Sequence, residues 1–104
     1  MKVLYIYPGM EPELAEIGND LRSMQECVEG AIEVVEPFDD DIALVCNEEG
    51  KLDGSMPNRA LYDSHGNLYD VVHGPFFLCG IGDDLEDFPL DLTEKYMERF
   101  ALVA

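Results

Sequence analysis

Short apolar runs that end at turn residues are the feature that most limits how this chain can fold. Residues 2–7, 42–46 and 76–81 are such runs, and each is followed by proline, asparagine or glycine. Short apolar or alternating stretches between turn signals are typical of β-strands. The first run is too short for a membrane span or for the apolar part of a signal peptide.

The order of these runs predicts two hairpins. Residues 2–7 are expected to pair with 13–17 across a Pro- and Gly-containing turn, and residues 31–37 with 42–46. In the second hairpin we expect Ile32 and Val34 to point inward, with Val35 as a further candidate. Residues 47–61 contain Gly, Pro and Asn and are expected to form a turn and an irregular passage, whereas residues 68–72 are expected to form a further strand.

Two helices complete the predicted fold. In the first, apolar positions recur with helical spacing after residue 20, so we expect Asn19 as its N-cap and Gly30 as the residue that ends it. In the second, Asp91 and Glu94 have the spacing of a capping box, and a stripe containing Tyr96 follows. The sequence therefore predicts one α+β domain over residues 1–104, a mainly antiparallel sheet with two helices packed on it.

Charge is the most unusual property of the composition. The chain has 104 residues, 47% of them hydrophobic, which is enough to bury a core and fold unaided. It has 23 Asp and Glu against 6 Lys and Arg, a formal net charge of -17. Nucleic acid and anionic membranes repel such a chain, so neither is expected as a direct partner. A host protein with a basic surface is the partner that we expect.

The acidic residues gather in two predicted turns, and no Lys or Arg occurs between residues 60 and 94. We therefore predict an acidic binding surface made of Asp39, Asp40, Asp41, Asp83, Asp84, Glu86 and Asp87. The alternative is that these residues are ordinary solvated turns, because blocks of like charge are usually exposed to water.

The cysteines and histidines give little sign of chemistry. Cys27, Cys46 and Cys79 are odd in number, far apart and set among apolar residues, which predicts buried free thiols and a cytoplasmic location. Their spacing relative to His65 and His73 matches no zinc pattern, and a nucleophilic cysteine would need one of these histidines as its base. We expect no metal, no cofactor and no catalytic residue.

A second candidate site is the polar passage that contains Asn47, Lys51, Asn58 and Arg59. Lys51 and Arg59 are two of the few cations, and together they could bind a small anionic ligand such as a nucleotide phosphate. In the alternative, Lys51 pairs with a neighbouring glutamate while Asn58 and Arg59 hydrogen-bond an otherwise unpaired loop backbone.

The string ALVCNEEGKLDGSMPNRAL at residues 43–61 resembles a small acidic domain-of-unknown-function family of phages, plasmids and other mobile elements in Gram-positive gut bacteria. The resemblance extends to residues 24–26, 30–35, 37–40, 74–77 and 92–94, and so covers nearly the whole chain. It implies a mobile-element accessory protein, whose common role is to counter host defences, and it transfers no catalytic residue.

Three functions remain open on this basis. The first is a non-enzymatic protein that inhibits or modulates a host protein by covering a basic, nucleic-acid-binding surface. The second is a small module that binds or sequesters a nucleotide, with Lys51 and Arg59 on the phosphate and an aromatic residue such as Tyr62 or Tyr69 against the base. A net charge of -17 opposes this function unless a local positive pocket forms. The third is a folded accessory domain that assists maintenance of the mobile element or assembles with itself through an exposed strand edge.

Overall fold

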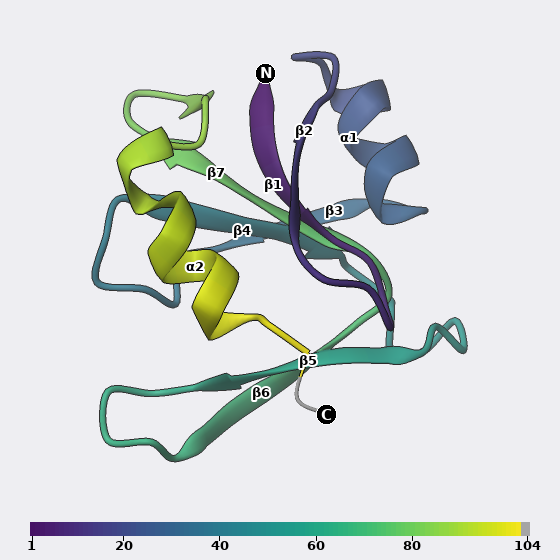
Figure 1. The fold of residues 1–104 in the computed structure, drawn as a ribbon. Helices are drawn as coiled ribbons and strands as arrows, with labels where there is room; N and C mark the ends of the chain where they lie inside the picture. Colours follow the sequence, from purple (N-terminus) through teal and green to yellow (C-terminus); the bar gives the residue numbers. More distant parts are fainter. Residues whose placement is uncertain (103–104) are drawn as a thin grey trace.

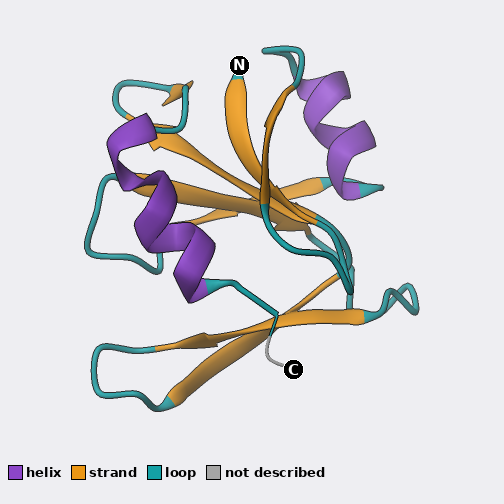
Figure 2. Ribbon diagram, in the orientation of Figure 1, coloured by secondary structure: helices purple, strands orange, loops and turns teal. Residues whose placement is uncertain are grey.

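The computed structural model describes residues 1–102 and contains two antiparallel sheets and two α-helices (Figures 1 and 2). The larger sheet has the strand order β2-β1-β7-β4-β3, with β8 paired to β7. Its strands are β1 (Lys2–Ile6), β2 (Glu13–Glu16), β3 (Ile32–Val35), β4 (Ile42–Asn47), β7 (Phe76–Ile81) and β8 (Leu85–Glu86). The smaller sheet is the hairpin of β5 (Pro57–Tyr62) and β6 (Leu68–His73). The predicted α+β class and both predicted hairpins are confirmed.

The central strands are apolar on both faces because both faces of the larger sheet are covered. Every residue of β4 is buried, as is every residue of β7 except Ile81. Helix α1 (Leu21–Val28) packs on one face through Met24 and Val28. The opposite face is covered by helix α2 (Thr93–Arg99) and by the β5–β6 hairpin, as Figure 1 shows. Such double coverage explains why these strands show no polar alternation.

The ends of α1 differ by one residue from the predicted ones. Asp20 is the N-cap, not Asn19, and its Oδ1 accepts a hydrogen bond of 2.7 Å from the Ser23 N–H. A carboxylate at this position also interacts favourably with the positive end of the helix dipole. At the other end Glu29, not Gly30, has the left-handed conformation, with φ of 62°. Gly30 is needed for space instead, because a Cβ there would lie 2.5 Å from Asn47 Nδ2.

The second helix forms without the predicted capping box. Asp91 lies inside a 3₁₀ turn (Leu90–Leu92) that leads into α2, and no side chain caps either element. An acidic pair with the right spacing cannot cap a helix when its first member is already within a helical turn. The predicted apolar stripe is confirmed, since Tyr96 and Phe100 are buried and Met97 packs against the same cluster.

Two further predictions were wrong. Val34 is 42% exposed rather than inward, because β3 is an edge strand that pairs with β4 alone among the described strands, whereas Val35 packs against the core. The passage predicted as irregular contains β5, which pairs with β6 through two register irregularities. Strand pairing thus overrides the weak β-propensity of Pro57 and Asn58.

No helix among the described residues has the length and apolar character that crossing a membrane requires.

Candidate functional site

A cleft of about 300 Å³ lies between the larger sheet and the hairpin. One wall comes from β3 and β4 and the other from β6, while the loop after β4 closes one end. Gly50 in this loop allows the close approach, because a Cβ there would lie 2.7 Å from the carbonyl oxygen of His73. Asn47 and Lys51 of the predicted ligand loop line the cleft.

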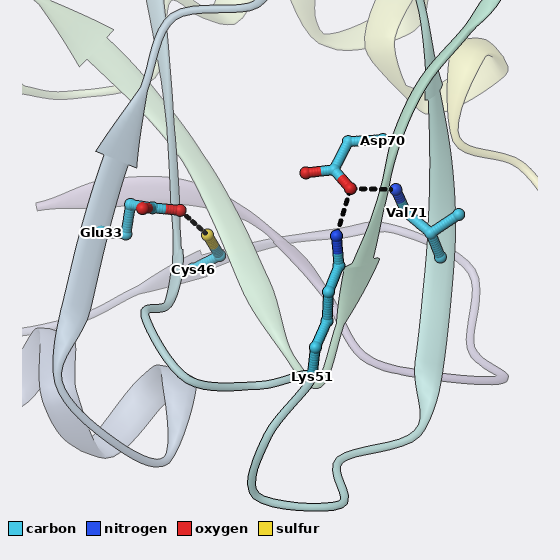
Figure 3. Close-up of polar contacts among 5 residues, drawn as sticks. All are labelled: Glu33, Cys46, Lys51, Asp70 and Val71. Carbon is cyan, nitrogen blue, oxygen red and sulfur yellow. Dashed lines mark hydrogen bonds and ion pairs between the residues drawn. The ribbon is translucent and has the colours of Figure 1, made fainter.

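Lys51 reaches across the cleft to the hairpin. Its ammonium forms a salt bridge and hydrogen bond with Asp70 Oδ1, which also accepts the Val71 N–H at 2.7 Å (Figure 3). The bond from Lys51 and the bond from the Val71 N–H hold the pKa of Asp70 below its usual value. The sequence suggested a neighbouring glutamate as the partner of Lys51, but the partner comes from a strand 19 residues away.

Cys46 lies on the opposite wall of the cleft, beside Glu33 of β3. Its Sγ is 3.9 Å from Glu33 Oε1, and Figure 3 shows this pair across from Lys51 and Asp70. Burial, together with the negative charge of Glu33, raises the pKa of the Cys46 thiol to about 11. The thiol therefore stays protonated at neutral pH, and the reactive thiolate is scarce. His73 Nδ1 is occupied elsewhere, 3.0 Å from the carbonyl oxygen of Ser55.

Asn47 joins the end of α1 to the loop that closes the cleft. The residue is 8% exposed, and its Nδ2 lies 3.3 Å from the Val28 carbonyl oxygen and 3.1 Å from that of Glu29. Its Oδ1 accepts the Glu49 N–H at 2.8 Å. These bonds satisfy helix carbonyls that have no partner within the helix. Asn47 thus shapes the cleft by positioning backbone.

Asn58 and Arg59 hold the hairpin against the larger sheet. Asn58 Nδ2 donates to the Ile6 carbonyl oxygen at 2.8 Å and to that of Gly74 at 2.9 Å. Arg59 Nε donates to the Phe100 carbonyl oxygen at 2.8 Å, and its Nη2 donates to that of Met10. Neither Asn58 nor Arg59 lines the cleft. The structure therefore separates Lys51 from Arg59, and the guanidinium binds the chain's own carbonyl groups.

The two predicted acidic turns lie at the same end of the larger sheet. Residues Ile42 and Gly80 are partners in the register of β4 and β7, and the Ile81 N–H donates to the Asp41 carbonyl oxygen at 3.2 Å. The segments 39–41 and 83–87 directly adjoin these positions, so they are neighbours at the left of Figure 1 although they are far apart in sequence.

Some of these carboxylates have partners within the chain. Asp40 Oδ2 accepts a bond of 2.7 Å from Lys95 and one of 2.6 Å from the Tyr96 hydroxyl. Asp87 accepts the Lys2 N–H and Asp84 accepts the Leu85 N–H, each at 2.8 Å. The remaining predicted members are exposed to solvent: Asp39, Asp41, Asp83 and Glu86.

Most of the cations have a partner within the chain. Besides Lys51 and Arg59, Lys95 pairs with Asp40, Arg22 pairs with Glu26 at 3.4 Å, and Arg99 lies 4.8 Å from the ring centre of Phe38. Five of the six cations thus have partners in the described part of the chain. The unbalanced charge at the surface is negative.

Within residues 1–102, no group of three or more His, Cys, Asp or Glu side chains is arranged to hold a metal ion. The cysteines are all free, with Cys46 and Cys79 buried and Cys27 half-buried. Burial raises the pKa of Cys27 to about 11 and that of Cys79 to about 12.

Sequence reasoning missed two residues of the cleft, Glu33 and Asp70, and it named Tyr69 only as an aromatic contact for a nucleotide base. No local pattern marks them, because they lie on strands of different sheets and meet only when the hairpin docks. The single sequence signal was Lys51, a cation in an acidic chain that requires a partner.

The fold and the cleft define a small α+β domain with an acidic sheet end and a recessed cavity between two antiparallel sheets. The chain belongs to the family described as Domain of unknown function (DUF3846), which it matches over residues 1–101. Comparison with curated proteins and with solved structures gave no match.

Proposed function

We propose that this chain is a non-enzymatic binding protein that inhibits or modulates a host protein by covering a basic, nucleic-acid-binding surface. The observation that carries the proposal is that two acidic turns, distant in sequence, adjoin at one end of the larger sheet. A cationic surface would meet several exposed carboxylates there at once, and charge complementarity of this kind steers association and selects partners.

The average charge density alone would not imitate a nucleic acid. A surface of 6271 Å² shared among 17 net negative charges gives about 370 Å² per charge. Duplex DNA, with one charge per about 1.7 Å of axis, is about three times denser. Gathering the carboxylates at one sheet end narrows this difference in charge density, even though Lys95 pairs with Asp40 there.

The proposed role is that of a mobile-element accessory protein that acts against a host defence. The resemblance of residues 43–61 to proteins of phages and plasmids supports this part of the proposal. The targets that fit are proteins with a basic groove for nucleic acid, because such grooves are open to a competing acidic surface.

The test is recovery of tagged protein from host-like cells, followed by native mass spectrometry at about 0.15 M and about 1 M salt, where the screening length falls from about 8 Å to about 3 Å. We expect a basic partner that is lost at high salt. A partner held equally at both salt concentrations would contradict the proposal.

A matched pair of variants locates the surface. Asp41→Asn with Asp83→Asn neutralises two exposed carboxylates at the acidic end, whereas Glu13→Gln with Glu98→Gln neutralises two exposed carboxylates elsewhere. We expect the first pair to weaken partner binding about threefold or more, since each exposed ion pair contributes on the order of 0.2–1 kcal/mol. Equal losses for the two pairs would place the binding surface outside the acidic end.

A further inference from the structure

The cleft between the two sheets has an apolar floor. Val35 of β3 lines the cleft and is half-buried, so it offers apolar surface there. Its neighbours Leu44, Leu61 and Val72 also line the cleft but are nearly closed to solvent, at 0%, 3% and 7% exposed. A ligand that enters this cleft must present an aliphatic stem to Val35, because a buried polar group without a partner is costly.

The rim of the cleft is acidic, in contrast to its floor. Its lining residues include four carboxylates, Glu33, Glu48, Glu49 and Asp70, and one cation, Lys51. The balance of charge is therefore -3 around the opening. A recessed opening of this sign concentrates cations and repels anions such as nucleotide phosphates.

An aromatic ring adds a second preference for cations. Tyr69 lines the cleft and is 61% exposed, so a ligand at the opening can reach this residue. A cation over such a ring is attracted by the negative charge of its π face. A guanidinium also stacks on aromatic rings and binds carboxylates through two hydrogen bonds, which an ammonium cannot do as well.

We propose that the cleft binds one arginine side chain of the basic partner protein, with the aliphatic stem on the apolar floor and the guanidinium between Tyr69 and the rim carboxylates. The cleft volume of about 300 Å³ is at the lower end for ligand pockets and suits a single side chain. The identity of the partner rests on the proposed function, but the cleft can be tested with peptides alone.

Lys51 gives the proposal a distinctive consequence. Its ammonium already occupies Asp70 and is the one cation among the lining residues of the described cleft. Lys51→Met would release Asp70 and remove the opposing charge, so arginine binding should strengthen. A site for an anionic ligand would require the opposite, because Lys51 would then be its main attraction.

The experiment is a titration of the ¹⁵N-labelled protein with acetyl-Gly-Arg-Gly-amide, compared with the same peptide containing neutral citrulline. Resonances of Cys46, Tyr69 and Val71 report on the cleft. We expect them to shift, with the arginine peptide bound about fivefold more tightly, as expected for an exposed ion pair together with a cation–π contact. Equal affinity for the two peptides would overturn the proposal.

Variants assign the effect to the cleft. Lys51→Met should tighten arginine binding about threefold and Glu33→Gln should weaken it about threefold, the size of one exposed charge interaction. Glu98→Gln, the same change on the exposed surface of α2, should have no effect. Each spectrum also shows whether its variant is folded. Weaker binding by Lys51→Met would overturn the proposal.

The results that would contradict the cleft site differ from those that would contradict the proposed function. Shifts confined to residues 39–41 and 83–87 would show that arginine binds the acidic end, which overturns the cleft site and leaves the acidic inhibitor intact. Arginine-specific shifts in the cleft, with partner binding that does not depend on salt, would retain the cleft site and contradict the acidic inhibitor.

Discussion

The two sheets of this protein are held in place by different kinds of contact. The larger sheet is buried between α1 on one face and α2 with the hairpin on the other, and its central residue Phe77 is fully buried. The β5–β6 hairpin contributes Leu61 and Val72 to the core, but several of its large side chains are exposed. Directional hydrogen bonds from Asn58 and Arg59 fix its position.

This difference in contacts indicates that the larger sheet mainly provides stability, whereas the position of the hairpin determines the shape of the cleft. Apolar burial is non-directional and determines that the larger sheet forms, whereas hydrogen bonds determine where the hairpin sits. Since the hairpin forms one wall of the cleft, the shape of the cleft depends on a few polar contacts. Changes in the larger sheet should thus alter stability, and changes at the hairpin junction should alter the cleft.

The largest effect is expected in the larger sheet. Phe77→Ala should lower the free energy of unfolding by about 3–5 kcal/mol, through lost burial and the cavity that remains. Leu68→Ala, on the exposed surface of β6, should change it by less than about 0.5 kcal/mol. Urea unfolding followed by circular dichroism measures both. Similar losses for the two variants would remove the distinction between the sheets.

A smaller effect is expected at the junction of the sheets. Arg59→Met keeps an unbranched apolar stem but removes the bonds to the Phe100 and Met10 carbonyl groups. Hydrogen bonds to charged groups contribute about 1.5–3 kcal/mol, and we expect a loss in this range. The amide resonances of Tyr69 and Val71 should also shift. A loss of stability without those shifts would show that Arg59 does not position the hairpin.

The acidic end should make stability depend on pH through Asp40. Bonds from Lys95 and Tyr96 lower the pKa of Asp40 below its ordinary value of 3.8. Its contribution is therefore present above that value and is lost as the pH falls through the lower folded pKa. Asp40→Asn should be less stable than wild type at neutral pH, and the difference should shrink below pH 3.8. Urea midpoints at neutral and acidic pH, with Asp39→Asn as control, measure this; a difference that does not depend on pH would contradict it.

Of the contacts between the two sheets, the salt bridge removed by Lys51→Met is expected to contribute least to stability. This salt bridge with Asp70 joins side chains that are 54% and 47% exposed, and such pairs contribute about 0–1 kcal/mol. The same variant is expected to tighten arginine binding in the cleft, so stability and binding should change separately. A large loss of stability would show that this pair, as well as Arg59, holds the hairpin.

Prediction from sequence succeeded where the pattern of apolar residues within one segment was enough to identify a strand or helix. The apolar runs of β4 and β7 and the apolar stripe of α2 were recognised because burial imposes a pattern on consecutive residues. It failed at β5, where Pro57 and Asn58 resemble a loop, because the strand owes its existence to pairing with β6. The wrong N-cap, Asn19, illustrates how closely neighbouring polar residues compete for a helix end.

The candidate sites also contain features that the sequence indicated and features that depend on tertiary contacts. The acidic turns were named from sequence, but their meeting at one sheet end follows from the pairing of β4 with β7. Lys51 and Arg59 were grouped because they are close in sequence, and the structure gives them separate partners. Glu33 and Asp70 carried no signal, since a residue's membership of a cleft depends on what docks opposite it.

The sequence by itself determined the charge, the α+β class, the central strands and the free cysteines, because each depends on composition or on spacing within a segment. Only the tertiary structure decided which acidic turns adjoin, which carbonyl groups Arg59 binds and where the cleft opens. Those features depend on contacts between residues far apart in the chain, and local periodicity does not specify how a hairpin docks on a sheet.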